Sequence, residues 1–404
     1  MTEKLLTKRR FKDGDNKHRP WVEEIFTADE SHKCPTYVHR APPCQGSCPS
    51  GEDIRGWLNI VRGIEKPPAD TTWQEYAFSR VTEANPFPAI MGRVCPAPCE
   101  DGCNRNEVED HVGINSVEQF IGDYGLEHGL KLHPPGEDTG KKVAIIGSGV
   151  AGLSCAYQLR RMGHACTVFE RQEKLGGMMR YGIPGYRVPD EVLDGEIQRI
   201  LDMGVEVRNN TRVGEDISFA DMRAQFDAVF IALGAQSGMA LPVPSGDAPN
   251  VISGVAFLQA FNDGRLQHTA GKVLVVGGGD TSMDVAAVAR RLGHIQHKRE
   301  HDRPENIIMG YMAHDVAGVA QRQGADVTLI SRESADIMPA TKMEVEHVTQ
   351  EGVKIRPGLL PVEVILGDDG RASGVRVIQT DWSSGQMETV AGTETELECD
   401  LLVS

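Results

Sequence analysis

Long apolar runs are missing from this sequence of 404 residues. No segment reaches the ~18 consecutive apolar residues that a membrane-spanning helix needs. The basic, polar start MTEKLLTKRRFKDGDNKHRP is not followed by the apolar stretch of a secretory signal. We therefore expect a cytoplasmic protein without a membrane span.

An excess of basic charge is missing as well. Lys and Arg together number 42 and Asp and Glu 58, so the net charge is −16. Nucleic acid is not expected as a main partner, because binding it depends on clustered Lys and Arg that neutralise phosphates. The length allows two or three domains, and 40% apolar with 25% charged residues is an ordinary soluble composition.

Cysteine, by contrast, is concentrated near the amino terminus. Six of the nine cysteines lie in the first 103 residues: Cys34, Cys44, Cys48, Cys95, Cys99 and Cys103. In a reducing compartment such clustering indicates metal binding before disulfides. Zinc is an alternative, but its structural sites usually show paired C-x2-4-C knuckles, and the C-x3-C-x3-C run with its Cys-Pro dipeptides fits an iron–sulfur cluster better. Cys155, Cys166 and Cys399 are expected to be buried small apolar residues.

The composition changes along the chain. Residues 1–135 are rich in Pro and Cys and contain helical periodicity over Ile54 to Ile64, and 130–142 reads as a linker. From Lys142 onward, short β-branched strands alternate with helices that begin after glycines, which predicts an α/β fold with parallel sheets. We expect a helical domain over 1–135 and two Rossmann-like modules over 141–270 and 271–404.

The stretch KKVAIIGSGVAGLSCAYQLRRMGHACTVFE contains a complete dinucleotide-binding pattern. Gly147 permits a tight turn, Gly149 lets the backbone approach a pyrophosphate, and Gly152 allows close helix packing. Glu170, which lies 23 residues after Gly147, can accept a hydrogen bond from a ribose hydroxyl. The later segment FDAVFIALGA predicts a strand that runs into Gly234, where the backbone can cap this site.

A second pattern, GKVLVVGGGDTSMDVAAVARRLGH, begins the same way. Its second strand, GADVTLIS, ends at Ser331, 54 residues after Gly277, which is 31 more than in the first module. Gly293 and Gly324, two counterparts of one glycine in the first module, are also 31 residues apart. An insertion over about 294–323 is therefore expected, as a surface elaboration rather than a metal site. The closing CDLLVS repeats the pattern of an acid, an apolar strand and a small residue.

Several motifs resemble the small subunit of glutamate synthase and its relatives, including the amino-terminal half of dihydropyrimidine dehydrogenase. They are PCQGSCP, NPFPAIMGRVCPAPCEDGC, GSGVAGLSCA, GGMMRYGIPGYRVP, GGGDTSMD and IMPATKMEVE. The lead segment and the insertion are most similar to the flavoprotein of dissimilatory sulfur metabolism that carries electrons between NADH and sulfite reductase. In this family the first sheet is completed after the second module, so the last part of the flavin domain is expected to be absent from these 404 residues.

The resemblance implies two [4Fe–4S] clusters in the helical domain, FAD on the first module and NAD(P)H on the second. It assigns Cys48, Cys95, Cys99 and Glu118 to one cluster. The other takes Cys44 and Cys103, where relatives supply two further cysteines and this chain offers Cys34 and His39. An exposed loop histidine is the alternative role for His39, so the fourth ligand stays open.

The resemblance also assigns the nucleotide-binding residues. Gly177 makes room for the flavin ring, and Arg187 lies near its polar edge. The flavin site comprises Gly147, Ser148, Gly149, Ala151, Gly152, Glu170, Arg171, Gly177, Arg187, Ala232 and Gly234. The nicotinamide site comprises Gly277, Gly278, Gly279, Asp280, Thr281, Ser331, Arg332 and Glu333. NADPH-preferring relatives have two arginines where this chain has Ser331-Arg332-Glu333, so NADH is expected, with NADPH left open.

The expected function is transfer of electrons from NADH through FAD and the clusters to a partner protein, either sulfite reductase or another large-subunit acceptor. A homodimer is one assembly that the resemblance allows. The cofactors carry out the chemistry, so no catalytic acid–base residue is assigned. One alternative is a glutamate synthase small subunit with a glutamine-hydrolysing partner. Another is an assembly module with structural clusters, which the two intact glycine patterns disfavour.

Overall fold

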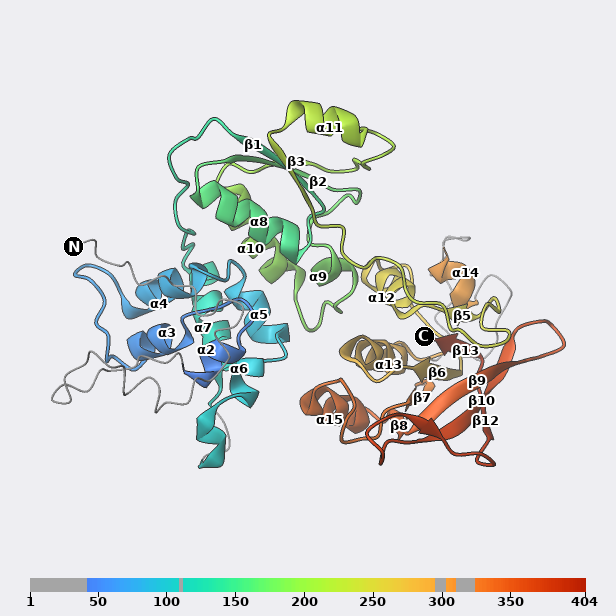
Figure 1. Cartoon of the computed structure of the whole chain (residues 1–404). Helices are drawn as coiled ribbons and strands as arrows, with labels where there is room; N and C mark the ends of the chain where they lie inside the picture. The colour runs from blue at the N-terminus through green and yellow to red at the C-terminus, as the bar shows by residue number, and fades with distance from the viewer. Residues whose placement is uncertain (1–41, 109–111, 295–302, 310–323) are drawn as a thin grey trace, which may run out of the picture. The chain divides into compact units, whose positions relative to one another are not determined.

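The computed structural model describes residues 42–108, 112–294, 303–309 and 324–404. The chain forms two compact units (Figure 1). Residues 147–150, 172–189 and 231–404 form the second unit, and the rest of the chain forms the first. Within the described ranges, no helix is long and apolar enough to cross a membrane.

The helical part of the first unit is built from short, well-capped helices. They are α2 (Pro43–Ser47), α3 (Ile54–Val61), α4 (Trp73–Thr82), α5 (Pro88–Val94), α6 (Pro98–Asp101), the 3-10 turn η1 (Asn104–Glu107) and α7 (Ile114–Glu127). The Asp53 side chain accepts from Gly56 N and caps α3, which confirms the predicted helix. Thr72 and Glu75 form a capping box at α4.

Helices α5 and α7 pack unusually closely. A Cβ on Gly92 or Gly122 would overlap the backbone of Gln119 or Ala89, so only glycine fits at either crossing point. This contact fixes the position of Glu118 on α7 relative to Cys95, which follows the last residue of α5.

The first Rossmann module provides the rest of this unit. Its elements are β1 (Lys142–Ile146), α8 (Val150–Arg161), β2 (Ala165–Phe169), α10 (Asp190–Leu201), β3 (Glu206–Arg208), α11 (Phe219–Gln225) and β4 (Ala228–Ile231). The strand order is β3-β2-β1-β4, with β1 parallel to β2 and β2 parallel to β3. Helices α8 and α10 lie on one face and α11 on the other (Figure 1).

Helix α10 connects the two parts of this unit through Glu196, which is fully buried. The carboxylate accepts from Ala89 N at 2.9 Å and Ile90 N at 3.0 Å, in the first turn of α5. Burial raises the pKa of Glu196 to about 8, although the two backbone donors and Arg199 lower it. The acid thus caps the helix that leads to Cys95.

The second unit contains a larger module. Its elements are α9 (Met178–Tyr181), β5 (Val251–Ile252), α12 (Gly254–Asn262), β6 (Lys272–Val276), α13 (Asp280–Leu292), α14 (Pro304–Ile308), β7 (Asp326–Ser331), α15 (Lys342–Gln350), β8 (Lys354–Pro357), β9 (Leu359–Leu366), β10 (Ala372–Asp381), β11 (Glu388–Thr389), β12 (Thr395–Glu398) and β13 (Leu401–Val403). Strands β5-β13-β6-β7-β8 form a parallel sheet, and β9 to β12 form an antiparallel meander.

Both faces of this parallel sheet are covered, as such sheets require. Val273, Val275 and Leu329 face the core made with α12, α13 and α15. Leu274 and Ile330 face the opposite core, which the meander completes with Val375. The predicted α/β class with a helical amino-terminal domain is thus confirmed.

Two expectations about buried residues are changed by the structure. The insertion is not wholly a surface feature, because Ile307 and Ile308 of α14 are buried in the core of the module. The histidine-rich composition of the insertion did not indicate that its apolar residues would pack into the core. Of the three isolated cysteines, Cys166 and Cys399 are buried as expected, and Cys155 is half-buried.

Candidate functional site

The turn after β1 has the geometry of a dinucleotide-binding turn. Gly147 has a φ of +101°, and a Cβ there would overlap the carbonyl oxygen of Ala232. A Cβ on Gly177, whose φ is +51°, would lie 2.7 Å from the Cα of Gly149. The backbone at these positions is therefore exposed to a ligand and closed to side chains. Gly234 also has a positive φ of +64°.

The acid predicted for the first ribose follows β2 directly. Glu170 is buried, its N donates to Arg208 O at 2.9 Å, and its carbonyl oxygen accepts from Thr211 N at 2.8 Å. Arg171 follows it on the exposed side. Gly152 is buried inside α8, as close helix packing requires. The roles of these residues in nucleotide binding stay predictions.

The turn after β6 repeats this arrangement. Gly277 has a φ of +141°, and Gly279 is the N-cap of α13, which begins at Asp280. A Cβ on Gly278 would overlap Ser331 Oγ and lie 3.2 Å from Glu333 Oε2. The strand end of β7 therefore lies against the glycine turn, where a bound ribose is expected.

Glu333 is held in place at this turn. Its Oε2 accepts from Ser331 Oγ at 2.7 Å, and its Oε1 accepts from Arg332 Nε at 2.8 Å. Partial burial acts to raise the pKa of Glu333, but these two partners outweigh it and the pKa is lowered. The acid is thus ionised near neutral pH, and the one arginine is already paired with it.

The meander fixes the backbone of Arg332 and Glu333. The carbonyl oxygen of Arg332 accepts from Thr380 Oγ1 at 2.7 Å and from Trp382 Nε1 at 2.9 Å. Gly358 N donates to the carbonyl oxygen of Glu333 at 2.8 Å. Neither Thr380 nor Trp382 was identified from the sequence, because pairing of a late hairpin with an earlier loop leaves no local pattern.

Arg187 lies among carboxylates of the second unit. Its Nη1 is 2.8 Å from Asp284 Oδ1, and its Nη2 is 2.7 Å from Glu344 Oε1. Burial raises the pKa of Asp284 to about 6, against the lowering effect of Arg187. The sequence analysis assigned Arg187 to the polar edge of the flavin and missed both acids, since nothing in the local sequence links residues about 100 and 150 positions apart.

The cysteines lie at helix ends in the helical part. Cys48 follows α2, Cys95 follows α5, Cys99 is in α6, and Cys103 precedes η1. A Cβ on Gly102 would overlap Ser47 Oγ, so the α2 end and the Cys103 turn approach each other through a glycine. Helix ends from distant segments therefore meet.

Electrostatic interactions show which of these side chains are neighbours. Burial, then the charges of Cys95, Cys48, Glu100 and Glu118, raises the pKa of the Cys99 thiol to about 12. Burial, then the charges of Cys103 and Cys48, raises the pKa of Cys44. Cys48, Cys95 and Glu118 thus lie near Cys99, Cys44 lies near both Cys103 and Cys48, and the division into two clusters stays a prediction. Cys34 and His39 lie outside the described residues.

Glu118 has polar neighbours that the sequence analysis missed. Asn85 Nδ2 donates to Glu118 Oε1 at 2.6 Å, and Glu52 is buried beside it. Burial, followed by the charge of Glu52, raises the pKa of Glu118 well above its ordinary value. Two adjoining acids among buried thiols are costly to ionise unless a positive group is bound.

Thiols with a carboxylate are a donor set that can hold an iron–sulfur cluster. Among the described residues, no three His, Cys, Asp or Glu side chains converge on a single metal position. A positive iron core would also offset the charge repulsion within the set.

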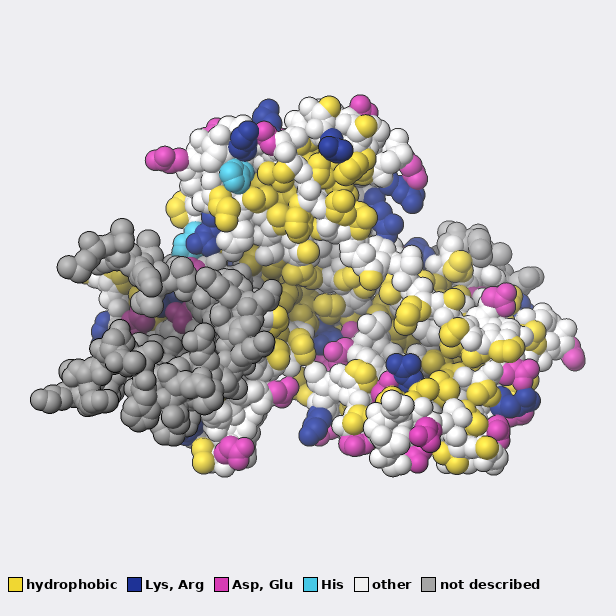
Figure 2. Space-filling view, viewed as in Figure 1, with side chains coloured by type: hydrophobic (Ala, Val, Ile, Leu, Met, Phe, Trp, Pro, Cys, Tyr) yellow, Lys and Arg dark blue, Asp and Glu magenta, His cyan; other side chains and the backbone are white. Residues whose placement is uncertain are grey.

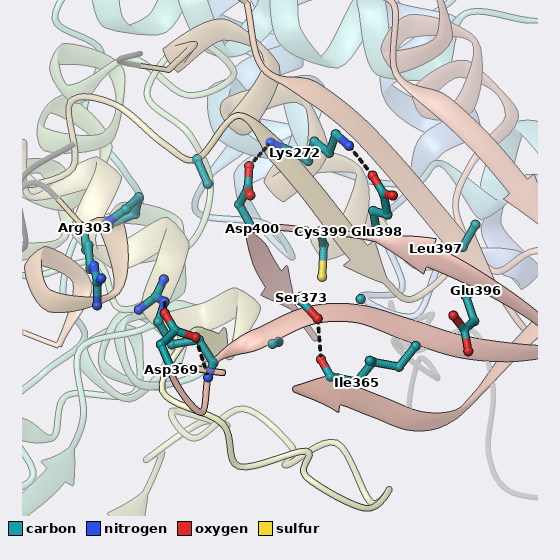
Figure 3. A pocket seen from close by; sticks show the side chains of 15 residues that line it. Lys272, Arg303, Ile365, Asp369, Ser373, Glu396, Leu397, Glu398, Cys399 and Asp400 are labelled. Carbon is teal, nitrogen blue, oxygen red and sulfur yellow. Dashed lines mark hydrogen bonds and ion pairs between the residues drawn. The ribbon is translucent and has the colours of Figure 1, made fainter. Parts of the chain in front are cut away.

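A separate cavity of about 600 Å³ lies in the second unit (Figure 3). Lys272, the first residue of β6, lines it together with Arg303 and Asp400. The glycine turn follows the other end of β6, so this cavity is distinct from the nucleotide turn. Lys272 is paired with Glu398, and Lys272 N donates to Asp400 Oδ2 at 2.8 Å.

The chain has two glycine turns, each followed by a strand with an acid at its end, and a group of neighbouring thiols and carboxylates. These features define a class of protein, namely a pyridine nucleotide oxidoreductase with an iron–sulfur domain. The family model for pyridine nucleotide-disulphide oxidoreductase matches residues 141–404. The model for dihydropyrimidine dehydrogenase domain II, 4Fe-4S cluster, matches residues 12–130. The chain belongs to the glutamate synthase small-chain family of iron–sulfur flavoproteins, as the following relatives show.

The chain is 34% identical over 378 residues to the glutamate synthase [NADPH] small chain of Mycobacterium tuberculosis, covering 90% of this chain and 71% of the relative. It is 30% identical to that of Escherichia coli, covering 90% and 73%. It is 32% identical to the NADPH-Fe(3+) oxidoreductase subunit beta of Geobacter sulfurreducens, covering 91% of this chain and 52% of the relative. The chain thus spans about half the length of that last protein.

Among solved structures, FprA of Mycobacterium tuberculosis in complex with NADPH is similar, with a TM-score of 0.51 and 18% identity. The match covers 67% of this chain and 70% of FprA. At this identity the likeness shows the fold alone. The matched families imply FAD and NAD(P)H binding over 141–404 and 4Fe–4S binding in the amino-terminal domain.

Proposed function

We propose that this chain is an NADH:acceptor oxidoreductase subunit that delivers electrons to a partner protein through iron–sulfur clusters. The observation that carries this proposal is the presence in one chain of two glycine turns and of the neighbouring side chains Cys48, Cys95, Cys99 and Glu118, of which Cys99 and Glu118 are buried. An assembly module would need neither turn. Two clusters are proposed, the second involving Cys44 and Cys103.

Each part of the chain has a distinct role in this scheme. The Gly147 turn and Glu170 would hold FAD, and the Gly277 turn and Glu333 would hold the nicotinamide nucleotide. When bound, the nicotinamide supplies a hydride to the flavin, which passes electrons singly to the clusters. The protein binds and orients these groups, and the packing of α5 against α7 keeps the cluster ligands fixed.

Cofactor content tests the scheme directly. The protein purified without oxygen should contain about eight irons, as two cubane clusters require, and one FAD per chain. NADH should bleach the flavin absorbance and then produce the EPR signal of a reduced cluster. Stoichiometric zinc with little iron would contradict the cluster assignment.

The role of Glu118 as a cluster ligand can be tested by mutation, with the adjoining acid Glu52 as the control. Because a carboxylate ligand alters the potential of a cluster, Glu118→Cys should retain the iron and shift the potential, whereas Cys99→Ala should lose the cluster. Glu52→Gln, at an adjoining buried acid that is not proposed as a ligand, serves as the control and should keep the full iron content. Unchanged iron and EPR spectrum in Glu118→Ala would exclude Glu118.

We propose that NADH is preferred over NADPH. A 2′-phosphate has a charge near −2 and is recognised by bidentate arginines, whereas here Glu333 is ionised and occupies Arg332. A lost charge-assisted contact of about 1.5–3 kcal/mol corresponds to a preference of roughly tenfold to a hundredfold in kcat/KM. Ser331→Arg with Glu333→Ser should narrow or reverse the ratio without changing flavin content. Equal rates in the unmodified protein would refute the preference.

As partner we propose the sulfite reductase of dissimilatory sulfur metabolism, on the similarity of the lead segment and the insertion to the flavoprotein of that system. A glutamate synthase large subunit is the second candidate, because glutamate synthase small chains share 30–34% identity with this chain. Reoxidation of the NADH-reduced protein should be fast with one of these two acceptors and slow with the other. Fast reoxidation by the glutamate synthase subunit alone would reverse our choice.

A further inference from the structure

One segment of the second unit, residues 176–187, runs from the flavin turn to the nicotinamide turn. We refer to it as the strap. At its first end, Gly176 N donates to the carbonyl oxygen of Ser148 at 3.1 Å. Gly177 approaches Gly149 so closely that no Cβ fits between them. The strap therefore begins in direct contact with the turn that would hold the FAD pyrophosphate.

The other end of the strap is attached to three helices of the nicotinamide module. Asn262 Nδ2 on α12 donates to the carbonyl oxygen of Ile183 at 3.0 Å. Arg187 Nη1 contacts both carboxylate oxygens of Asp284 on α13, at 2.8 and 2.9 Å, and its Nη2 contacts Glu344 on α15. Helix α9 of the strap lies beside α12 (Figure 1).

Both acids lie next to the nicotinamide turn. Asp284 is one helical turn beyond Asp280, the first residue of α13. Ala340 N donates to the carbonyl oxygen of Gly278 at 2.9 Å, which ties the start of the α15 segment to the glycine turn. Glu344 is in the first turn of α15. The strap therefore ends where the nicotinamide dinucleotide is expected to bind.

The charges at this end are unbalanced without Arg187. Asp280, Asp284 and Glu344 are three carboxylates close to a site that must accept an anionic pyrophosphate. The Arg187 side chain is only 17% exposed and that of Asp284 8%, so this pair is weakly screened by water. The Arg187 guanidinium thus helps to hold the strap, beside Asn262 and Arg291, whose guanidinium carbon lies 3.5 Å from the centre of the Tyr186 ring, and it reduces the negative potential at the turn.

From these contacts we propose that Arg187 is a positioning residue, which fixes the flavin turn relative to the nicotinamide turn through Asp284 and Glu344. This inference rests on the proposed function, in which a hydride passes between the two nucleotides. A reacting distance that changes by about 1 Å can cost on the order of a hundredfold in rate. Loosening the strap should therefore slow flavin reduction far more than it weakens binding of either nucleotide.

The experiment compares two arginines of equal exposure in the holoprotein. Arg187→Met removes the ion pairs of the strap with Asp284 and Glu344 and leaves the Asn262 hydrogen bond in place. Arg371→Met removes the ion pair with buried Glu305, and Arg371 is also 17% exposed. Stopped-flow bleaching of the flavin by NADH gives the limiting rate and the half-saturating NADH concentration. FAD content and amide hydrogen exchange over residues 178–187 are measured in parallel.

For Arg187→Met we expect a limiting rate at least about tenfold lower, with FAD content and half-saturation within about twofold, and faster exchange in the strap. Arg187→Lys should recover part of the rate, and Arg371→Met should leave rate and exchange unchanged. An unchanged limiting rate with a higher half-saturation would overturn the proposal, since Arg187 would then only offset charge for the pyrophosphate. An equal slowing by Arg371→Met would overturn it as well.

If Arg187→Met does not retain FAD, the same measurements on Asp284→Asn test the proposal. This variant weakens the contact with Arg187 while leaving Arg187 and Glu344 in place. A wild-type protein whose flavin is not bleached by NADH would contradict the proposed function itself. Bleaching in the wild type with no slowing in Asp284→Asn would contradict the strap alone.

Discussion

The two Rossmann modules share one plan and differ in what covers them. In each, an acid before the last strand binds the first strand: Asp227 accepts from Lys142 N and Asp400 from Lys272 N. Yet Phe230 in β4 is 40% exposed, whereas β13 is fully buried between β5 and β6. Apolar side chains are visible on the surface of the molecule (Figure 2). The local sequence thus specifies that β4 and β13 are strands. How far each strand is buried depends on segments that are distant in the sequence.

Helices α10 and α15, which occupy equivalent places in the two modules, differ in the opposite direction, because the helix of the first module is the more buried one. Helix α10 of the first module buries Glu196 and Arg199 against the helical domain, whereas in α15 of the second only Val348 is buried. Each module is therefore most constrained where a further element packs on it, the helical domain for the first and the meander for the second.

The largest expected effect concerns the two glycine turns. Gly147→Ala should lower bound FAD more than about tenfold, because its Cβ would overlap the backbone oxygen of Ala232 and the φ is unfavourable. Gly277 also has an unfavourable φ, of +141°, but an added Cβ there would overlap only the Ser282 side chain, whose hydroxyl can rotate away. Gly277→Ala should therefore raise the half-saturating NADH concentration by less. FAD content and NADH titration measure both. Equal loss at the two turns would show that the backbone contact is not decisive.

The last strands provide the next effect. Leu402→Ala removes a fully buried side chain and should lower the free energy of unfolding by about 2–5 kcal/mol. Phe230→Ala in β4 removes a side chain that is 40% exposed and should cost less. Denaturant unfolding followed by circular dichroism compares them. A larger cost at Phe230 would mean that β4 is covered in the protein in solution.

The effect that is smallest per step of the experiment is a pH dependence of stability in the first module, which amounts to little over a single pH unit. The raised pKa of Glu196 means that the native state holds a proton which the unfolded state releases above its ordinary value near 4.5. Stability from this group is therefore lost as pH rises from about 4.5 to about 8, with a slope of at most about 1.4 kcal/mol per pH unit. Glu196→Gln should remove that slope.

Asp227, which precedes β4, is the control. The hydrogen bond from Lys142 N, followed by that from the Lys141 side chain, lowers the pKa of Asp227. Asp227→Asn should therefore run parallel to the wild type between pH 5 and 8 in unfolding experiments. If Glu196→Gln also runs parallel, its carboxyl is ionised in the native protein.

Much of the molecule follows from local sequence. The glycine turns, the strand that leads into each and the acid that ends β2 are encoded within about 30 residues, as a βαβ unit allows. The grouping of Glu118 with Cys95 came from resemblance, and its structural basis is the crossing of α5 and α7 at two glycines. What could not be predicted depends on contacts between distant segments, namely Arg187 with Asp284, Glu196 with α5, and buried α14 within the insertion.

The two hydrogen bonds from the meander to the Arg332 carbonyl have a consequence for how such proteins diverge. Since Thr380 and Trp382 hold the Arg332 backbone, the side chain of Glu333 can change without loss of these two hydrogen bonds. In the function that we propose, coenzyme choice would then depend on side chains presented by a fixed support. A lineage could change its source of reducing equivalents by few substitutions, while the electron-transfer core stayed the same.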